Sequence, residues 1–314
     1  MIKTYLKQLK ENSTGIGSYF DMIWCTIRYG ASPNNYKNFG FKELNSAQRA
    51  TYVTNGLSRK IIKTFNDPAY IDIFEDKTEF AKRFSDYFGR TWISTEHLTY
   101  DAFLKFLDGK EKFIYKPVGN AQGKGIHIFD NLKNPKKVYD EIQGLPGKAI
   151  LEEWIVQHEQ LNAVYDKAIN CLRIITFCKG DSVKFLAGGV TWGNGKQIAN
   201  VCTSGIVSPV DFESGILKKP AADFSGRVYK THPITNANLV GIKVPYWNEI
   251  KIMLKNAAKE VPQVRYIGWD VAITPDGPIL IEGNTTPGYR YYQIPAHMEN
   301  KCGNRRVYES CLRE

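Results

Sequence analysis

The sequence lacks any uninterrupted apolar stretch long enough to cross a membrane as a helix, which takes about 20 residues. Residues 1–10 alternate lysines with apolar side chains and contain neither a long apolar core nor a small-residue cleavage site. A secretory signal is therefore not expected. These absences predict a cytoplasmic protein without a transmembrane segment.

Metal-binding and disulfide patterns are also missing. Six cysteines stand at positions 25, 171, 178, 202, 302 and 311 without a CxxC pair, and the five histidines are scattered. Structural zinc needs closely spaced Cys or His ligands, so neither a zinc site nor a disulfide framework is expected. In the cytoplasm these cysteines should be reduced thiols. No Ser-His-Asp or Cys-His nucleophile is evident either.

Acidic residues are outnumbered: 42 Lys and Arg stand against 32 Asp and Glu in 314 residues, a net charge of +10. The basic residues are spread along the chain, and no Arg-rich block with interleaved aromatics points to nucleic acid. Phosphates, uronates, an anionic membrane surface or a solvated surface with no partner are each compatible with this charge. With 43% hydrophobic residues, the chain can build one large enzyme domain or two to three lobes.

Hydrophobic periodicity indicates an α+β protein. Apolar residues recur at helical intervals in the N-terminal region, over 1–30, 46–66 and 77–88, and later over 136–142 and 246–260. Strand patterns cover 112–117, 125–129, 149–155, 172–177, 183–187, 271–274 and 279–282. We predict a compact chain of successive lobes with a largely helical N-terminal region.

A glycine-rich loop follows the strand predicted at 112–117. Its candidate ligand-binding residues are Lys116, Gly119, Gln122, Gly123, Lys124 and Gly125. Three glycines within seven residues let the backbone approach a ligand, and successive N–H groups can cradle phosphate oxygens. The spacing fits neither a Walker A loop nor a Rossmann fingerprint. An ordinary glycine-rich hairpin remains the alternative.

Acidic residues end the apolar strand at 149–155, where Glu152 and Glu153 precede Trp154 and Ile155. Unpaired carboxylates are costly to bury, so these acids would suit a cleft, with the backbone meeting an adenine edge and a carboxylate holding ribose hydroxyls. Glu159 follows seven residues after Glu152. A strand that simply emerges into solvent is the alternative.

The segment 269–284 carries the strongest chemical pattern. Two apolar strands flank the turn 274–277, which is typical of a hairpin and would place Asp270 beside Glu282. Asn284 lies two residues beyond Glu282, so its side chain should face the same way. Such hard oxygen ligands suit Mg²⁺ rather than Zn²⁺. A surface hairpin with incidental acids is the alternative.

Two further polar residues stand out. Arg173 interrupts an apolar strand, so an anionic partner is expected, either a phosphate or a structural ion pair. His232 could touch a substrate carboxylate or could be a plain loop histidine.

The glycine-rich loop, the acidic end of the strand at 149–155 and the hairpin at 269–284 follow one another in the order that resembles the ATP-grasp superfamily. The resemblance extends over about residues 75–290. The resemblance implies an ATP-grasp fold with two α+β lobes clamping ATP, and it implies ATP and Mg²⁺ as cofactors. Lys77 and Lys116 are similar to the two nucleotide lysines, residues 152–155 to the hinge that meets adenine, and Glu159 to the ribose carboxylate. The metal triad is matched by Asp270, Glu282 and Asn284. Residues 284–288, with Thr286 and Gly288, resemble the end of the D-alanine ligase motif.

The closer resemblance is to sugar-transfer-associated ATP-grasp proteins. It rests on residues 29–31, 90–93, 170–173, 232–235 and 267–270. It implies a ligase that joins an amino acid to a sugar uronate through an acyl-phosphate, in capsule or O-antigen biosynthesis. Arg173 and Lys116 would then act on the transferring phosphoryl group, and His232, Thr286 and Gly288 would face substrate. The lobes are predicted at 1–80, 81–154 and 155–314, and the helical first lobe departs from the α/β lobe of D-alanine ligases.

Three alternatives stay open. A phosphotransferase on the same fold would release no free phosphate, and a nucleotide-binding module would not turn over. A membrane-peripheral scaffold of a polysaccharide assembly complex would use the basic N-terminal helix. The sequence identifies neither the carboxylate donor, the amine, nor the oligomeric state.

Overall fold

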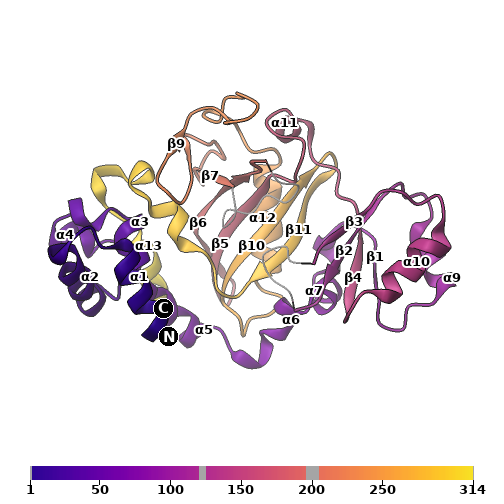
Figure 1. Cartoon of the computed structure of the whole chain (residues 1–314), viewed down its shortest axis with the longest axis horizontal. Coiled ribbons are helices and arrows are strands. Elements are labelled where there is room, and N and C mark those ends of the chain that lie inside the picture. Colours follow the sequence, from indigo (N-terminus) through magenta and orange to yellow (C-terminus); the bar gives the residue numbers. More distant parts are fainter. Residues whose placement is uncertain (1, 120–124, 196–204, 314) are drawn as a thin grey trace.

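The computed structural model describes residues 2–119, 125–195 and 205–313. Figure 1 shows three parts in a row: a helical N-terminal part at the left, a large sheet in the centre and a smaller α+β lobe at the right. Within these residues, no helix combines the length and the apolar character that a membrane crossing requires.

Short helices build the N-terminal part. They are α1 (Ile2–Asn12), α2 (Ile16–Tyr29), α3 (Pro33–Asn38), η1 (Phe41–Glu43), α4 (Ser46–Arg49) and α5 (Asn55–Phe65). Gly30 ends α2 in the left-handed conformation, and a Cβ there would lie 2.9 Å from the Cα atom of Gly56. Ser32 and Asn35 then form a capping box that begins α3. Glycine is needed at position 30 both for the backbone conformation and for this close approach of α5.

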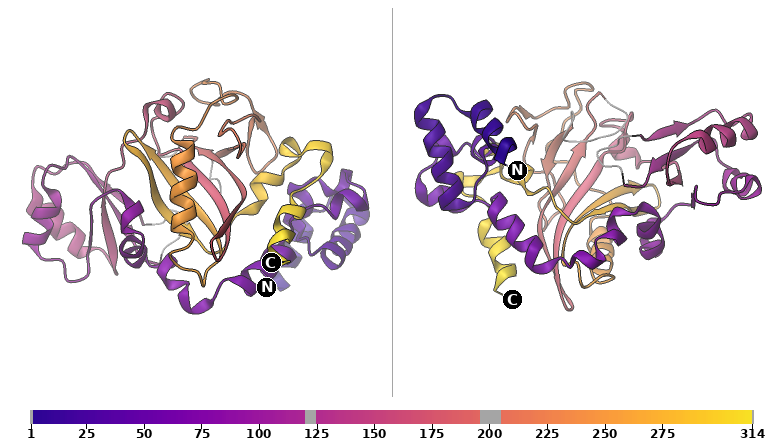
Figure 2. Two further views of the ribbon diagram at one scale, coloured as in Figure 1. Left: turned by 180° about the vertical axis from the view of Figure 1, so that it is seen from behind. Right: turned by 60° about the horizontal axis from the view of Figure 1, so that its bottom comes forward.

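The central part is a seven-stranded antiparallel sheet in the order β11-β10-β5-β6-β7-β8-β9. Its strands are β5 (Cys171–Lys179), β6 (Ser182–Trp192), β7 (Ile206–Pro209), β8 (Ala221–Ala222), β9 (Val228–Tyr229), β10 (Tyr266–Thr274) and β11 (Gly277–Asn284). Because side chains alternate between faces, Ile174 and Trp269 pack under α12 (Trp247–Ala257), which covers one face in Figure 2. Ile175 and Phe177 point to the other face and pack with the N-terminal helices.

The smaller lobe is a four-stranded antiparallel sheet in the order β1-β4-β2-β3. It contains β1 (Trp92–Ser94), α9 (Tyr100–Leu107), β2 (Phe113–Pro117), β3 (His127–Phe129), α10 (Pro135–Gly144) and β4 (Ala149–Glu153). Helices α9 and α10 cover one face of this sheet through buried side chains such as Phe103 and Ile142, which pack on Phe113. The chain leaves the lobe after Glu153 and reaches α11 (Glu159–Asn162), whose Leu161 packs in the core of the large sheet.

Short helices along β11 connect the parts. They are η2 (Pro68–Tyr70), α6 (Asp72–Glu75), α7 (Lys77–Arg83) and α8 (Ser85–Phe88). Phe74, Phe80 and Phe84 join the core that α12 shares with the large sheet. Residues 81–88, which the sequence assigned to the small lobe, therefore pack with the large sheet.

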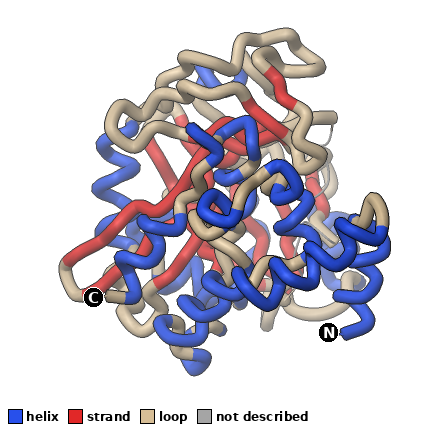
Figure 3. Tube along the Cα trace, turned by 90° about the vertical axis from the view of Figure 1, so that its left-hand side faces the viewer, coloured by secondary structure: helices blue, strands red, loops and turns tan. Residues whose placement is uncertain are grey.

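The C-terminal segment returns to the N-terminal part. It forms η3 (Tyr289–Gln293), η4 (Pro295–His297), η5 (Glu299–Lys301) and α13 (Arg305–Leu312). Tyr308 and Cys311 of α13 share a core with Met22 of α2 and Phe177 of β5. The N-terminal helices thus have a common core with the large sheet, and Figure 3, viewed from their side, shows helices in front of the strands.

The predicted fold class, α+β, is confirmed. The predicted strands at 112–117, 149–155 and 172–177 and the hairpin around 274–277 are present, with ends shifted by a few residues. The continuous helices expected at 46–66 and 77–88 are each broken in two, at residues 50–54 and at Phe84. The short strand β1 and strands β7 to β9 were not predicted.

Candidate active site

Alternation along two neighbouring strands places Arg173 and Asp270 on the face of the large sheet opposite α12. The two residues are partners in the β5–β10 register, and their sequence neighbours pack in the core beneath α12. The guanidinium of Arg173 forms a two-point ion pair with the carboxylate of Asp270. This ion pair lies in the middle of the sheet, facing away from its helical layer.

The hairpin β10–β11 adds two oxygen-bearing side chains beside this pair. Glu282 is the register partner of Asp270, as the turn predicted, and a bulge follows directly. The Asn284 Nδ2 atom lies 3.3 Å from Glu282 Oε1, and Arg173 Nη2 lies 3.9 Å from the same oxygen. Three oxygen-bearing side chains, those of Asp270, Glu282 and Asn284, therefore meet on one face of the hairpin.

The electrostatics of this group suit a divalent cation. Burial and the neighbouring carboxylate of Asp270 raise the pKa of Glu282, and Arg173 offsets only part of this effect. Two carboxylates and an amide oxygen are ligands that Mg²⁺ accepts, and its charge would relieve the repulsion between the acids. Among the described residues, no group of three or more His, Cys, Asp and Glu side chains is placed to hold a metal. The fit therefore depends on Asn284 as the third ligand.

A second charged group lies on the small lobe, on the sheet face away from α9 and α10. Glu152 is only 2% exposed, and its Oε2 atom accepts hydrogen bonds of 2.7 Å from Lys116 Nζ and from Arg90 Nε. Burial alone would raise the pKa of Glu152, but Arg90 and Lys116 hold it below its ordinary value. Glu152 is therefore a buried anion that fixes two cations.

Arg90 is a site residue to which the sequence assigned no role. Besides Glu152, it donates from Nη1 to the carbonyl oxygens of Phe88 (2.8 Å) and of Leu280 in β11 (2.7 Å), while its guanidinium carbon lies 3.5 Å from the centre of the Phe88 ring. Its buried Nη2 atom has no hydrogen-bond partner among the described residues. Arg90 thus links the small lobe to the large sheet. In the sequence it stood only within the segment 90–93 that carries the family resemblance, without a role of its own.

Lys77 lies between the two charged groups. Its ammonium donates to the carbonyl oxygen of Pro117, at the end of β2, over 2.9 Å. Burial lowers the pKa of Lys77, Glu282 acts in the opposite direction, and Lys116 lowers it further. Lys116 in turn influences the pKa of Glu282. The bond from Lys77 to Pro117 therefore ties α7, which packs along β11, to the end of β2 in the small lobe.

Residues 56–301 match the family described as sugar-transfer associated ATP-grasp. The chain belongs to this family. The match covers both lobes and every predicted site residue, and with the two-lobed architecture it confirms the ATP-grasp fold expected from the sequence. No curated protein matched the chain.

Solved structures give remote similarities to ATP-grasp ligases. PsnB complexed with minimal precursor has 15% identity and a TM-score of 0.47, over 79% of this chain and 63% of that one. The D-alanine-D-alanine ligase from Coxiella burnetii has 12% identity and a TM-score of 0.41, over 76% and 53%. The N5-carboxyaminoimidazole synthetase from Staphylococcus aureus has 9% identity and a TM-score of 0.43, over 69% and 45%. This chain spans less than two thirds of each.

The expected adenine hinge of this family follows β4. Glu153 Oε2 accepts hydrogen bonds from the backbone N–H (3.0 Å) and the hydroxyl (2.8 Å) of Thr91, the residue before β1. The Lys112 ammonium lies over the Trp154 ring, 4.1 Å from the ring centre. Ile155 is half-buried. Glu159 is exposed at the start of α11. The backbone beyond Glu153 is the segment left for an adenine contact.

The glycine-rich loop is described only at its two ends. Gly119 and Gly125 have φ angles of +81° and +73°, and a Cβ atom on either would meet none of the described residues within 4 Å. Their backbone conformation favours glycine at both positions. Gln122, Gly123 and Lys124 lie outside the described residues.

The segment after β11 folds back beside the metal-ligand candidates. Pro287 covers Gly268 of β10, where a Cβ atom would lie 3.2 Å from Pro287 Cβ. This brings the exposed Thr286 and the half-buried Gly288 to the sheet two residues from Asp270. Both residues therefore lie next to the strand that carries Asp270.

His232 does not join the charged residues described above. Its ring is completely buried, with a stacking distance of 5.0 Å to Tyr165. Nδ1 accepts from the backbone N–H groups of Ile234 and Thr235, so Nε2 carries the proton and donates to the Gly193 carbonyl over 2.6 Å. With both nitrogens engaged inside the protein, the expected substrate contact has no basis in this arrangement.

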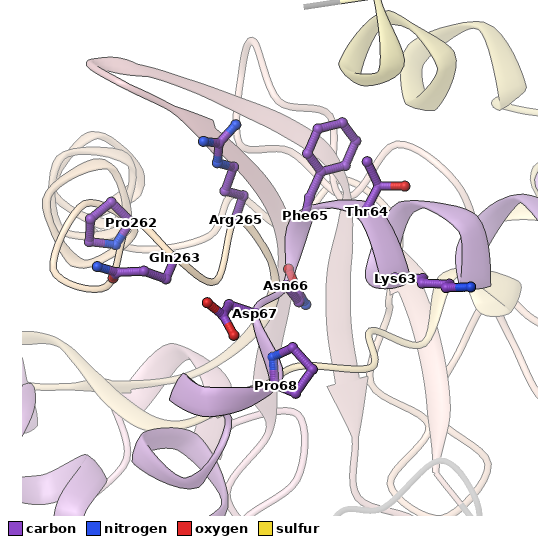
Figure 4. Close-up of a pocket in the computed structure, with 9 residues that line it drawn as sticks. All are labelled: Lys63, Thr64, Phe65, Asn66, Asp67, Pro68, Pro262, Gln263 and Arg265. Carbon is purple, nitrogen blue, oxygen red and sulfur yellow. The ribbon is translucent and has the colours of Figure 1, made fainter.

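A surface recess of about 650 Å³ lies elsewhere, between the end of α5 and the loop that precedes β10. Figure 4 shows its lining residues, which include Lys63, Asp67 and Arg265. None of the candidate catalytic, nucleotide or metal residues lines it. Asn66, at its base, is a structural residue that hydrogen-bonds to Tyr266 of β10 and to Thr285.

Proposed function

We propose that this protein is an ATP- and Mg²⁺-dependent carboxylate–amine ligase that forms an amide bond through an acyl-phosphate. The observation that carries the proposal is the chain of contacts that runs from Lys116 through Glu152 and Arg90 to the Leu280 carbonyl, two residues before Glu282. Cations on one side and a cation-binding carboxylate pair on the other match the needs of a polyphosphate and its metal. Membership of the ATP-grasp family supports the same conclusion.

In the proposed reaction, a substrate carboxylate oxygen attacks the γ-phosphorus of ATP as the bond to ADP breaks. An amine nitrogen then attacks the acyl carbon, phosphate leaves, and the nitrogen loses a proton. Mg²⁺ bound by Asp270, Glu282 and Asn284 would neutralise charge on the phosphates.

The chain's own residues orient and stabilise the reacting groups. Lys77 and Lys116 would hold phosphate oxygens from the small-lobe side, with Lys116 kept in place by Glu152. Arg173 would turn part of its guanidinium toward the transferring phosphoryl group and the acyl-phosphate. Gly119 and Gly125 frame the loop expected over the phosphates, which would keep water from the acyl-phosphate. The backbone after Glu153 would meet adenine, and Glu159 the ribose.

The substrates are proposed as an amino acid and a uronic acid sugar, in surface-polysaccharide biosynthesis. This finer proposal rests on the description of the family as sugar-transfer associated. Thr286 and Gly288 would contact the carboxylate substrate. Cytoplasmic sugar nucleotides and amino acids would be available to the enzyme if it is cytoplasmic, as the sequence predicts.

The test is release of ADP and free phosphate with Mg²⁺ and ATP, across pooled amino acids and uronic acids or their sugar nucleotides. We expect both products only when a carboxylate and an amine are both present. ADP without free phosphate would show a phosphotransferase instead. ATP binding without either product from any pair would support a binding module and contradict the ligase.

The metal site has its own test. Asp270→Asn with Glu282→Gln removes both negative charges and should lower Mg²⁺-dependent turnover by at least about a hundredfold. Asp276→Asn, at the exposed tip of the same hairpin, is the matched control and should keep full activity. Near-normal turnover of the double variant would refute the assigned metal ligands.

A further inference from the structure

Helix α2 is apolar on two opposite faces. One face packs into the core through Met22 and Cys25, which are fully buried. The other face carries Ile16, Phe20, Trp24 and Ile27, which are 55–80% exposed. At 100° per residue these four side chains fall within a narrow sector, so they form one stripe. We call these four residues the outer face of α2.

The neighbouring helix α1 extends the same character. Ile2 and Leu6, one turn apart, are 77% and 51% exposed, while Leu9 anchors the helix in the core. The Tyr5 hydroxyl donates to Thr26 Oγ1 over 2.8 Å and so ties α1 to α2. Six large apolar side chains are thus exposed on two adjoining helices, and four of them form the single stripe on α2. Single exposed apolar residues are ordinary, but four in one stripe mark an interaction site.

Positive charge is concentrated in the same region. Residues 1–65 contain ten Lys and Arg against three Asp and Glu, which accounts for +7 of the chain's net +10. One of the three acids, Asp21, is neutralised by a two-point ion pair with Arg49. Lys3, Lys10 and Arg28 are exposed on α1 and α2 themselves. A partner for this region should therefore be both apolar and anionic.

We propose that α1 and α2 dock this protein on an anionic lipid bilayer, with the outer face of α2 entering the headgroup region. Exposed Trp, Phe and Ile side chains beside Lys and Arg are the combination that binds such an interface. A protein partner would need to supply both a large apolar groove and acidic residues. The proposal is independent of the ligase function, because it needs neither ATP nor a carboxylate.

The location of these helices is compatible with docking. Figures 1 and 2 both place the N-terminal helices and the small lobe at opposite ends of the molecule. Lipid contact at α2 would therefore leave the small lobe, with Lys116 and Glu152, at the far end of the molecule from the bilayer.

The test is co-sedimentation of the full-length chain with vesicles of phosphatidylglycerol and phosphatidylcholine, compared with vesicles of phosphatidylcholine alone. We expect binding to the anionic vesicles that weakens several-fold between about 0.1 M and 0.5 M salt, because screening shortens electrostatic attraction. Phe20→Ser with Trp24→Ser should lower the partition coefficient at least about tenfold, because two large apolar side chains no longer enter the lipid. Both positions are exposed, so the thermal midpoint should be unchanged.

Matched control variants distinguish vesicle binding through α1 and α2 from nonspecific binding through other exposed residues. Ile252→Ser, on α12 and 61% exposed, should leave vesicle binding unchanged. Lys3→Gln, Lys10→Gln and Arg28→Gln together should weaken binding, whereas Lys105→Gln, Lys133→Gln and Lys255→Gln, also exposed, should not to the same extent. Absence of vesicle binding, or equal binding by the Phe20 and Trp24 double variant, would overturn the proposal. Self-association that the double variant abolishes, without lipid binding, would show instead an interface between copies of the chain.

Discussion

Glu152 accepts hydrogen bonds from two cations, Arg90 and Lys116, at a position almost closed to solvent. Glu152→Gln would leave both cations without a counter-charge, and breaking a buried ion pair from one side costs about 3 kcal/mol. We expect urea denaturation to show this loss of stability. Glu153→Gln, the adjacent and less buried acid, should cost about 1 kcal/mol or less. Equal losses from the two variants would contradict the role of Glu152 as a shared counter-ion.

For single residues, the sequence predicts the position on a strand or turn better than it predicts the contacts with residues distant in the chain. Asp270 and Glu282 could be paired from the turn between them, because a tight hairpin sets the register of its strands. Arg90 could not be paired with Glu152, which lies 62 positions away, because nothing local to either residue encodes that contact. His232 fails for the same reason: its buried stacking partner, Tyr165, is distant in sequence.

Helix α7 shows how a short element positions a site residue. Asp76 caps its N-terminus by accepting from the backbone N–H groups of Thr78 (2.8 Å) and Glu79 (3.2 Å), and it pairs with Lys148 over 3.0 Å. Lys77 is the next residue. Burial opposes ionisation of Asp76, yet the bonds from Thr78 and Lys148 lower its pKa to about 2 from an ordinary 3.8.

This lowered pKa has a consequence for acid stability. The stabilisation is fully present above pH of about 3.8 and is lost as pH falls through about 2. Asp76→Asn keeps a cap but removes the charge, so it should flatten the pH dependence of unfolding over that window by about 2 kcal/mol. Asp72→Asn, in α6, should retain the wild-type profile. Urea unfolding at a series of pH values checks both, and an unchanged slope in Asp76→Asn would refute the assignment.

Element ends were the weaker part of the sequence prediction. The regions 46–66 and 77–88 have helical periodicity throughout, yet the first breaks around the buried Tyr52, which is out of phase with Leu57 and Ile61, and the second breaks at the buried Phe84. Packing overrides local propensity there. Strands of two to four residues, such as β1 and β8, carry too few residues for any period to be read.

The whole molecule depends on its N-terminal helices. They cover Ile175, Phe177 and Tyr266 on one face of the large sheet and share a single core with α13. A fragment beginning at residue 55 would expose this apolar surface, so we expect it to aggregate or to bind a hydrophobic dye strongly. A soluble monomer that unfolds cooperatively would show instead that residues 1–54 form a separate domain. The sequence could not reveal this dependence, since strand and helix patterns do not say which faces meet.

The contact between Thr91 and Glu153 determines where the chain could be cut and rejoined in protein engineering. The backbone N–H of Glu153 donates to the Thr91 carbonyl over 2.9 Å, at the positions where the chain enters and leaves the small lobe. The whole lobe is thus one continuous segment of the chain, and its first and last residues are adjacent in space. Such a segment can be exchanged between related proteins, or replaced by a short linker, without changing the path of the rest of the chain. Recombination within the family would therefore be best tolerated with crossover points at Thr91 and Glu153.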